Sequence, residues 1–127
     1  MNRAFHHPGI LETRQALGET TLIADPAQIV DLCRYLKTTE KFVRLSSITA
    51  VDWHPAEPRF EVVYHLHSIE PNRRLRVKYM IGGVNPETES VMSVWRGANW
   101  YEREIFDLFG ITFRNHPNLV RILMPID

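Results

Sequence analysis

The 127-residue sequence contains a single cysteine, Cys33. One thiol cannot form a disulfide within the chain, and it cannot supply the sulfur ligands of a cysteine-only zinc or iron–sulfur site. This usage is typical of a protein from a reducing compartment. Cys33 falls on an apolar stripe, so we interpret it as a thiol packed in the core, the alternative being a reactive thiol.

Long apolar runs and an excess of charge of one sign are also missing. No run approaches the roughly 18 apolar residues of a membrane-spanning helix, and the N-terminal stretch MNRAFHHPGI lacks the apolar part of a secretory signal. Lys plus Arg and Asp plus Glu number 15 each, so the formal net charge is zero. Balanced charge disfavours nucleic acid or an anionic membrane as a partner. We expect a soluble chain.

One domain is expected over residues 1–127, because the length suits a single core and no repeat or linker interrupts it. Residues Ile10–Ala16 and 20–24 predict a weak hairpin or two short extended segments. Asp25 and Pro26 predict the cap and the first residue of a helix. Its predicted buried stripe recurs at helical spacing and consists of Ile29, Leu32, Cys33 and Leu36.

The middle of the chain has the period-two alternation of β-strands. A strand is predicted over residues 45–53, and two more are joined by the loop 68–73 into an antiparallel hairpin. Its predicted buried face consists of Phe60, Val62, Tyr64, Leu66, Leu75, Val77, Tyr79 and Ile81. The opposite face sets Glu and His of one strand against Arg and Lys of the next, which is typical of a solvated or docking surface.

Two helices are predicted in the C-terminal third. Asn85 and Pro86 resemble a cap and a first helical residue, so a short helix is expected through residues 91–95. A second helix is expected over Ala98–Phe109, with Gly110 ending it. These elements together predict an α+β fold, an antiparallel β-sheet with helices packed on one face.

Two histidines on one strand raise the question of a metal site. His65 and His67 lie on the same face of a predicted strand and could form half of a zinc site. The sequence places no third and fourth ligand, so two surface histidines are the preferred interpretation. His6 and His7, near the N-terminus, are a weaker candidate.

An acid–base cluster is a second candidate, formed by Glu102, Glu104 and Asp107. At 100° per helical residue, however, Glu102 and Glu104 point about 160° apart and cannot converge on one substrate atom. No nucleophile–base pair or phosphate-binding glycine motif accompanies them. We therefore expect no catalytic, cofactor-binding or metal-binding residue in this chain, with a small metal-dependent hydrolase as the alternative of another class.

The same helix carries more aromatics than its own core requires. Its predicted inner stripe consists of Ala98, Tyr101, Ile105, Leu108 and Phe109. Trp100 and Phe106 fall outside this stripe, and Arg103 and Asp107 form an i, i+4 pair on the far side. Exposed aromatics ringed by charge indicate a protein interface. The alternative is that both aromatics widen the core.

The run WYEREIFDLFGITFRNHPNLVR, from Trp100 to Arg121, closely resembles the diagnostic segment of the respiratory complex I 30 kDa subunit family, also called the C-subunit family. The family pattern is Glu-Arg-Glu, an aromatic or apolar residue, Asp, an apolar pair and Gly. A turn of the type Asn/Asp-His-Pro-Asn/Asp-Leu-x-Arg follows it. The similarity extends over residues 45–123 and includes Ala50-Val51-Asp52-Trp53 and Arg74-Leu75-Arg76-Val77-Lys78.

The resemblance implies a non-catalytic, peripheral-arm subunit of the proton-translocating NADH:quinone oxidoreductase (complex I), on the cytoplasmic side of the inner membrane. The FMN and iron–sulfur clusters of such a complex are bound by other subunits. The implied partners are the large quinone-site subunit (D-like) and the terminal iron–sulfur subunit (B-like). Homologous subunits serve membrane-bound hydrogenases and formate hydrogenlyases, and the sequence leaves that alternative open.

The resemblance also implies which residues contact a partner: Trp100, Glu102, Arg103, Glu104, Phe106, Asp107, Gly110, His116, Pro117 and Arg121. Family members usually continue beyond residue 125 into a segment that extends over a neighbouring subunit, whereas this sequence ends at Asp127. The expectation is therefore one domain of the 30 kDa type without the usual C-terminal extension.

Overall fold

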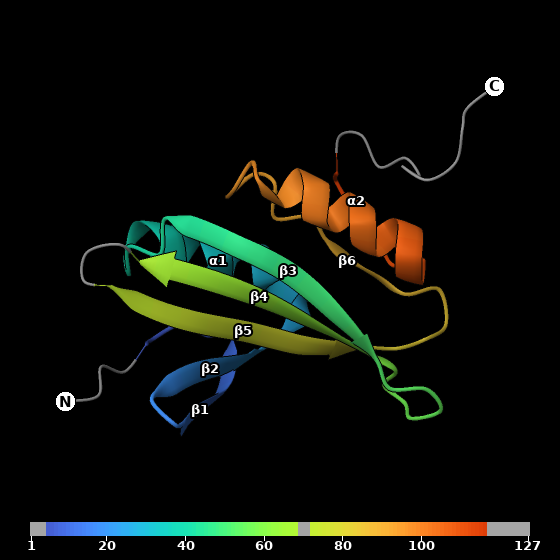
Figure 1. The fold of residues 1–127 in the computed structure, drawn as a ribbon, viewed down its shortest axis with the longest axis horizontal. Helices are drawn as coiled ribbons and strands as arrows, with labels where there is room; N and C mark the ends of the chain where they lie inside the picture. The colour runs from blue at the N-terminus through green and yellow to red at the C-terminus, as the bar shows by residue number, and fades with distance from the viewer. Residues whose placement is uncertain (1–4, 69–71, 117–127) are drawn as a thin grey trace.

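A computed structural model describes residues 5–68 and 72–116 (Figure 1). Its main sheet contains, in spatial order, β1 (Ile10–Ala16), β2 (Glu19–Ala24), β5 (Arg73–Ile81), β4 (Phe60–Ser68) and β3 (Arg44–Asp52). The remaining elements are the 3-10 helix η1 (Pro26–Gln28), α1 (Ile29–Thr38), β6 (Glu87–Glu89), α2 (Ala98–Phe109) and β7 (Thr112–Arg114). The predicted α+β fold is confirmed.

The main sheet is mixed, whereas an antiparallel sheet was expected. Strands β1–β2, β5–β4 and β4–β3 pair antiparallel, but β2 and β5 pair parallel, with Leu22 opposite Val77. Parallel neighbours require a long crossover, and here the chain passes through α1, β3 and β4 between them. The predicted N-terminal hairpin is confirmed, since Leu17 and Gly18 have the positive φ angles of a tight primed turn.

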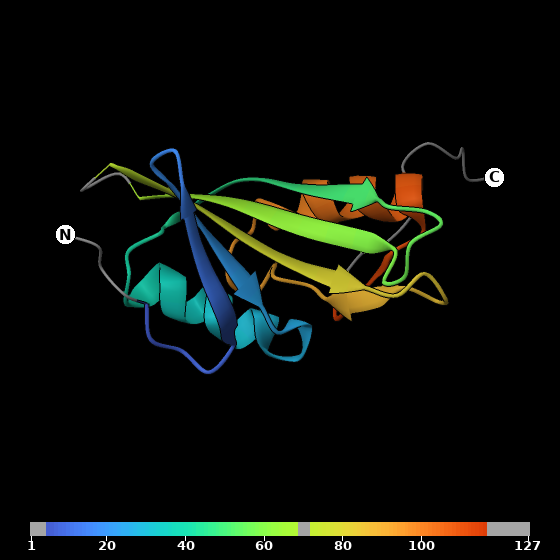
Figure 2. The ribbon, with the colours of Figure 1, turned by 90° about the horizontal axis from the view of Figure 1, so that it is seen from below.

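The cap predicted at Asp25 is formed, and it begins the 3-10 helix η1, which leads directly into helix α1. The Asp25 carboxylate accepts the backbone N–H of Ala27 at 3.0 Å, and Pro26 occupies the first turn. The helix lies on one side of the sheet (Figure 2), and its stripe of Ile29, Leu32, Cys33 and Leu36 is fully buried. Burial raises the pKa of the Cys33 thiol well above its usual range, so the prediction of a core thiol is confirmed.

The predicted inner face of the β4–β5 hairpin is confirmed, because all eight of its apolar residues are buried. Two of them are tyrosines, whose hydroxyl groups lie 2.9 Å apart. The Tyr79 hydroxyl is also hydrogen-bonded to the Thr88 hydroxyl of β6 at 2.9 Å. This chain of hydroxyl groups satisfies polar atoms inside the core and joins the small β6–β7 sheet to the large one.

The short helix expected through residues 91–95 is not formed, and the prediction is wrong. Asn85 has a φ of 48°, so it does not cap a helix, and residues Glu87–Glu89 extend into β6 beside β7. The backbone N–H of Ser90 then donates to the carbonyl of Arg114 rather than entering a helix. This region forms a single helical turn, in which the Trp95 N–H donates to the Val91 carbonyl at 2.9 Å.

Helix α2 ends at Gly110 as predicted. Gly110 has a φ of 73°, in the left-handed region, and its N–H donates to the Phe106 carbonyl. This geometry lets the chain turn sharply from α2 into β7.

We predict that Gly110→Ala lowers the free energy of unfolding by about 1 kcal/mol, because an L side chain is disfavoured at positive φ. A Cβ at this position meets no atom within 4 Å, so the cost is one of backbone conformation alone. Gly97→Ala is the matched control, since Gly97 is equally open and has a φ of −62°. Urea unfolding of the two variants measures the difference, and equal stabilities would contradict the prediction.

Candidate functional site

Helix α2 is fastened to the sheet along its inner face. It runs beside β3 (Figure 1), and the Tyr101 hydroxyl donates to the Ser46 carbonyl on that strand at 2.7 Å. At its other end the Phe109 ring packs edge-on against Phe60, with ring centroids 6.1 Å apart. Ile105 lies between them and is buried. The helix is therefore held at both ends without using its outer face.

The inner face of α2 also carries a carboxylate with no exposed surface, that of Glu102. Its Oε1 accepts the Ser90 hydroxyl at 2.6 Å, and its Oε2 accepts the Val91 backbone N–H at 2.8 Å. The Ser90 oxygen in turn accepts the Met92 N–H at 3.1 Å. Glu102 thus fixes the turn that follows β6, and its buried oxygens have hydrogen-bond donors.

Burial raises the pKa of Glu102 to about 7, although the hydrogen bonds from Ser90 and Val91 oppose the rise. The His116 Nε2 lies 4.0 Å from the Glu102 Oε1, and both side chains are fully enclosed. Burial also lowers the pKa of His116, and the positive charge of Arg103 adds to this effect. The interior under α2 therefore favours the uncharged form of both side chains.

The inner stripe of α2 differs from the predicted one at two positions. Leu108, expected inside, is 62% exposed, whereas Glu102, a predicted partner contact, is buried. Compared with the predicted orientation, the buried face of α2 is rotated toward Glu102. The reason is that Ser90 and Val91 donate hydrogen bonds to this carboxylate. A hydrophobicity pattern alone counts any glutamate as an outward residue. Within this chain Glu102 positions the turn at residues 90–91, and its predicted contact with a partner stays a prediction.

The outer face of α2 carries Trp100 and Glu104 of the predicted contact set. Trp100 is 54% exposed, and Trp100, Glu104 and Leu108 follow one another at i, i+4 spacing. The flanking members of the predicted set are partly exposed and consist of Arg103, Phe106 and Asp107. We call the stripe of Trp100, Glu104 and Leu108 the α2 outer surface. Glu104 belongs to this surface and Glu102 is buried on the inner face, as expected for two carboxylates that point in different directions from one helix.

The sequence predicts two further pairs of candidates, one near the C-terminus and one on a strand. Pro117 and Arg121 lie outside the described residues. His65 and His67 lie on β4, and within residues 5–68 and 72–116 no group of three or more His, Cys, Asp and Glu side chains is arranged to hold a metal ion. Burial and the charge of Arg76 lower the pKa of His65.

The raised pKa of Glu102 predicts a pH-dependent stability. As pH rises from about 4.5 to about 7, the unfolded carboxyl ionises while the folded one stays protonated, so this group's contribution to folding falls. Glu102→Gln resembles the protonated acid and lacks this loss. We expect the variant to gain about 3 kcal/mol relative to the native chain across that interval.

Urea unfolding at several pH values measures this gain, with Glu104→Gln as the control on the partly exposed side of the same helix. If the difference in unfolding free energy between the native chain and Glu102→Gln does not change with pH, the raised pKa of Glu102 is contradicted.

No helix in the described part of the chain combines the length and apolar character needed to cross a membrane. Residues 22–127 match the family model for the respiratory-chain NADH dehydrogenase 30 Kd subunit. The match includes the end of β2, β3 to β7 and both α-helices.

Curated relatives are named as the C subunits of NADH-quinone oxidoreductases. The protein of Geobacter sulfurreducens is 44% identical over 119 residues, which cover 93% of this chain and 74% of the relative. That of Roseiflexus sp. is 42% identical, with 98% of this chain and 73% of the relative covered.

Two solved structures share the fold. A trypsin-resistant fragment of Nqo5 superposes with a TM-score of 0.75 at 30% identity, covering 83% of this chain and 86% of the fragment. A chain of the membrane-bound sulfane sulfur reductase, an archaeal respiratory membrane complex, gives a TM-score of 0.81 at 27% identity over 94% of this chain and 71% of that chain. Motif, fold and relatives agree, and this chain belongs to the family of the respiratory-chain NADH dehydrogenase 30 kDa subunit.

Proposed function

We propose that this chain is a non-catalytic subunit in the peripheral arm of a proton-translocating NADH:quinone oxidoreductase, and that it acts by binding neighbouring subunits. The α2 outer surface is the contact that carries the proposal. Trp100 and Leu108 remain exposed although Tyr101, Glu102 and Ile105 already attach the helix to its own domain. Support for the complex comes from the names of relatives that are 44% and 42% identical.

The composition of the α2 outer surface fits a protein contact. Tryptophan is enriched among residues that dominate binding energy, and charged neighbours usually form the rim around such anchors. Here Glu104 lies between the two apolar residues, and Arg103 and Asp107 lie on the same side of the helix. A helix that is immobilised from behind loses little conformational entropy when a partner binds it.

The finer assignment follows the family. The partners are the large quinone-site subunit (D-like) and the terminal iron–sulfur subunit (B-like), and the chain is a peripheral component on the cytoplasmic side of the membrane. FMN and the iron–sulfur clusters belong to other subunits, and this chain contributes no cofactor ligand of its own. The enclosed position of Glu102 supports a positioning role over proton transfer to a substrate.

Membership of another respiratory membrane complex is the second candidate, because the chain also superposes on a component of the sulfane sulfur reductase complex. That likeness rests on 27% identity, whereas the NADH-quinone oxidoreductase C subunit of Geobacter sulfurreducens is 44% identical. The NADH:quinone oxidoreductase is therefore the better-supported assignment.

Truncating the two anchors tests the contact. We expect Trp100→Ala and Leu108→Ala each to weaken association with the other subunits by about 1–3 kcal/mol, as is typical of buried interface anchors. Affinity purification through a tag on the full chain, followed by quantification of the co-purified subunits, measures the loss.

Leu11→Ala is the matched control, because Leu11 is 64% exposed on β1 at the far edge of the sheet. Unfolding curves should show that the three variants are as stable as the native chain. Undiminished recovery of the complex with both α2 variants would refute the assignment of this surface.

A further inference from the structure

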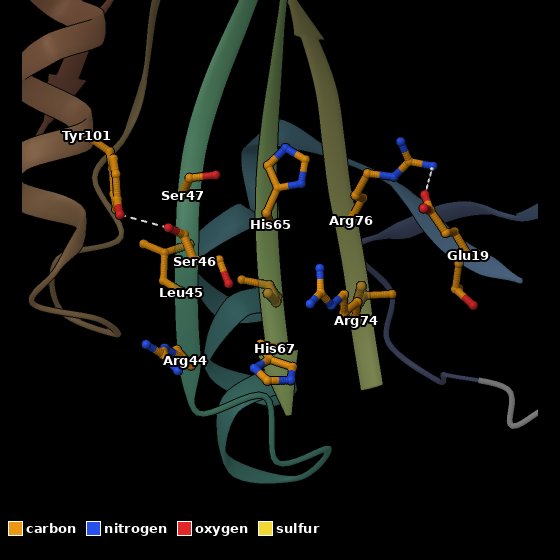
Figure 3. Close-up of a pocket in the computed structure, with 13 residues that line it drawn as sticks. Glu19, Arg44, Leu45, Ser46, Ser47, His65, His67, Arg74, Arg76 and Tyr101 are labelled. Carbon is orange, nitrogen blue, oxygen red and sulfur yellow. Dashed lines mark hydrogen bonds and ion pairs between the residues drawn. The ribbon is translucent and has the colours of Figure 1, made fainter. Parts of the chain in front are cut away.

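A groove of about 710 Å³ lies on the face of the main sheet opposite the helices' core contacts (Figure 3). Its floor is formed by strands β3, β4 and β5, and its rim by Glu19 and Tyr101. Three arginines line it, Arg44, Arg74 and Arg76, whereas Glu19 is the one acidic residue among its lining residues. The groove is thus cationic in a chain whose formal net charge is zero.

The arginines differ in their partners. Arg76 pairs with Glu19 at 2.8 Å. Arg44 and Arg74 are exposed, and neither forms an ion pair with a residue in the described ranges. No carboxylate of residues 5–68 and 72–116 therefore competes with an external anion for these two guanidinium groups.

The strand register places these two arginines in one row. Arg44 of β3 and Arg74 of β5 are both direct partners of His67 on β4, and Figure 3 shows His67 between them. Neighbouring strands lie about 4.8 Å apart, so the two arginine backbones are about 10 Å apart. Basic side chains on the two strands that flank β4, with a histidine and no acid between them, contribute nothing favourable to the fold. A bound anion would offset their repulsion.

We propose that this groove binds an acidic segment of a partner protein, whose carboxylates pair with Arg44 and Arg74. Guanidinium groups bind carboxylates through two parallel hydrogen bonds, and acids about two helical turns apart, roughly 11 Å, have a spacing that suits such a row. Tyr101 joins the groove to α2, so a neighbouring protein bound to the α2 outer surface can reach it. The identity of the partner as another subunit of the complex rests on the proposed function. The preference of the groove for carboxylates is independent of that function.

A segment of protein fits this face better than an anionic bilayer. Glu19 and Glu61 lie on the same face as the arginines, and Glu61 pairs with Lys78 at 3.1 Å beyond the row. A flat anionic surface would meet these carboxylates together with the arginines, whereas a narrow acidic segment meets the row alone.

The test measures binding of a fluorescent decaglutamate peptide to the full chain at low salt by anisotropy. We expect the double substitution Arg44→Gln with Arg74→Gln to weaken binding about tenfold or more. Arg34→Gln with Arg96→Gln is the matched control, because it removes the same charge from two exposed arginines outside the groove. The control should bind the peptide nearly as well as the native chain.

Equal weakening by the two double variants, or none by the groove variant, would overturn the proposal. So would vesicles of anionic phospholipid that bind through Arg44 and Arg74 while the peptide does not. Trp100→Ala separates this inference from the proposed function, since it should leave peptide binding unchanged even where it releases the chain from the complex. In the assembled complex, the groove variant should dissociate at lower salt than the control variant.

Discussion

The arrangement of the C-terminal third depends on the buried carboxylate of Glu102. Its two oxygens accept hydrogen bonds from Ser90 and Val91, which lie 12 and 11 residues earlier in the chain. An ionisable group without exposed surface is stable only where donors surround it. The bonds to Glu102 therefore determine how α2 is rotated, and the position of the turn after β6 follows from the same contact.

This rotation gives α2 two faces with different roles. The inner face is occupied by Ile105, Glu102 and the Tyr101 hydrogen bond to β3. The outer face presents Trp100 and Leu108, which have no core to fill within the described chain. One helix thus carries a buried acid and an exposed tryptophan, and we propose that it positions itself with one face and binds a neighbouring protein with the other. On the open side of the sheet, the arginine row adds a cationic surface beside it.

Elements governed by local periodicity were predictable from the sequence. The α1 stripe around Cys33 and the alternation of β4 and β5 are confirmed, since period and capping are local signals. The parallel β2–β5 pairing was not, because no local pattern encodes partners that far apart in sequence. The burial of Glu102 was also missed, because its donors belong to a turn that was predicted as helix. Trp100 as an exposed aromatic was anticipated correctly, whereas Leu108 was assigned to the core.

The central claim is that the α2 outer surface lies against another subunit of the respiratory complex. Its most direct test introduces a photo-crosslinking amino acid in place of Trp100 in the full chain, assembles the complex and identifies the adduct by mass spectrometry. The account predicts a covalent adduct with another subunit of the NADH:quinone oxidoreductase. An intact complex that yields no adduct from this position after irradiation would contradict it.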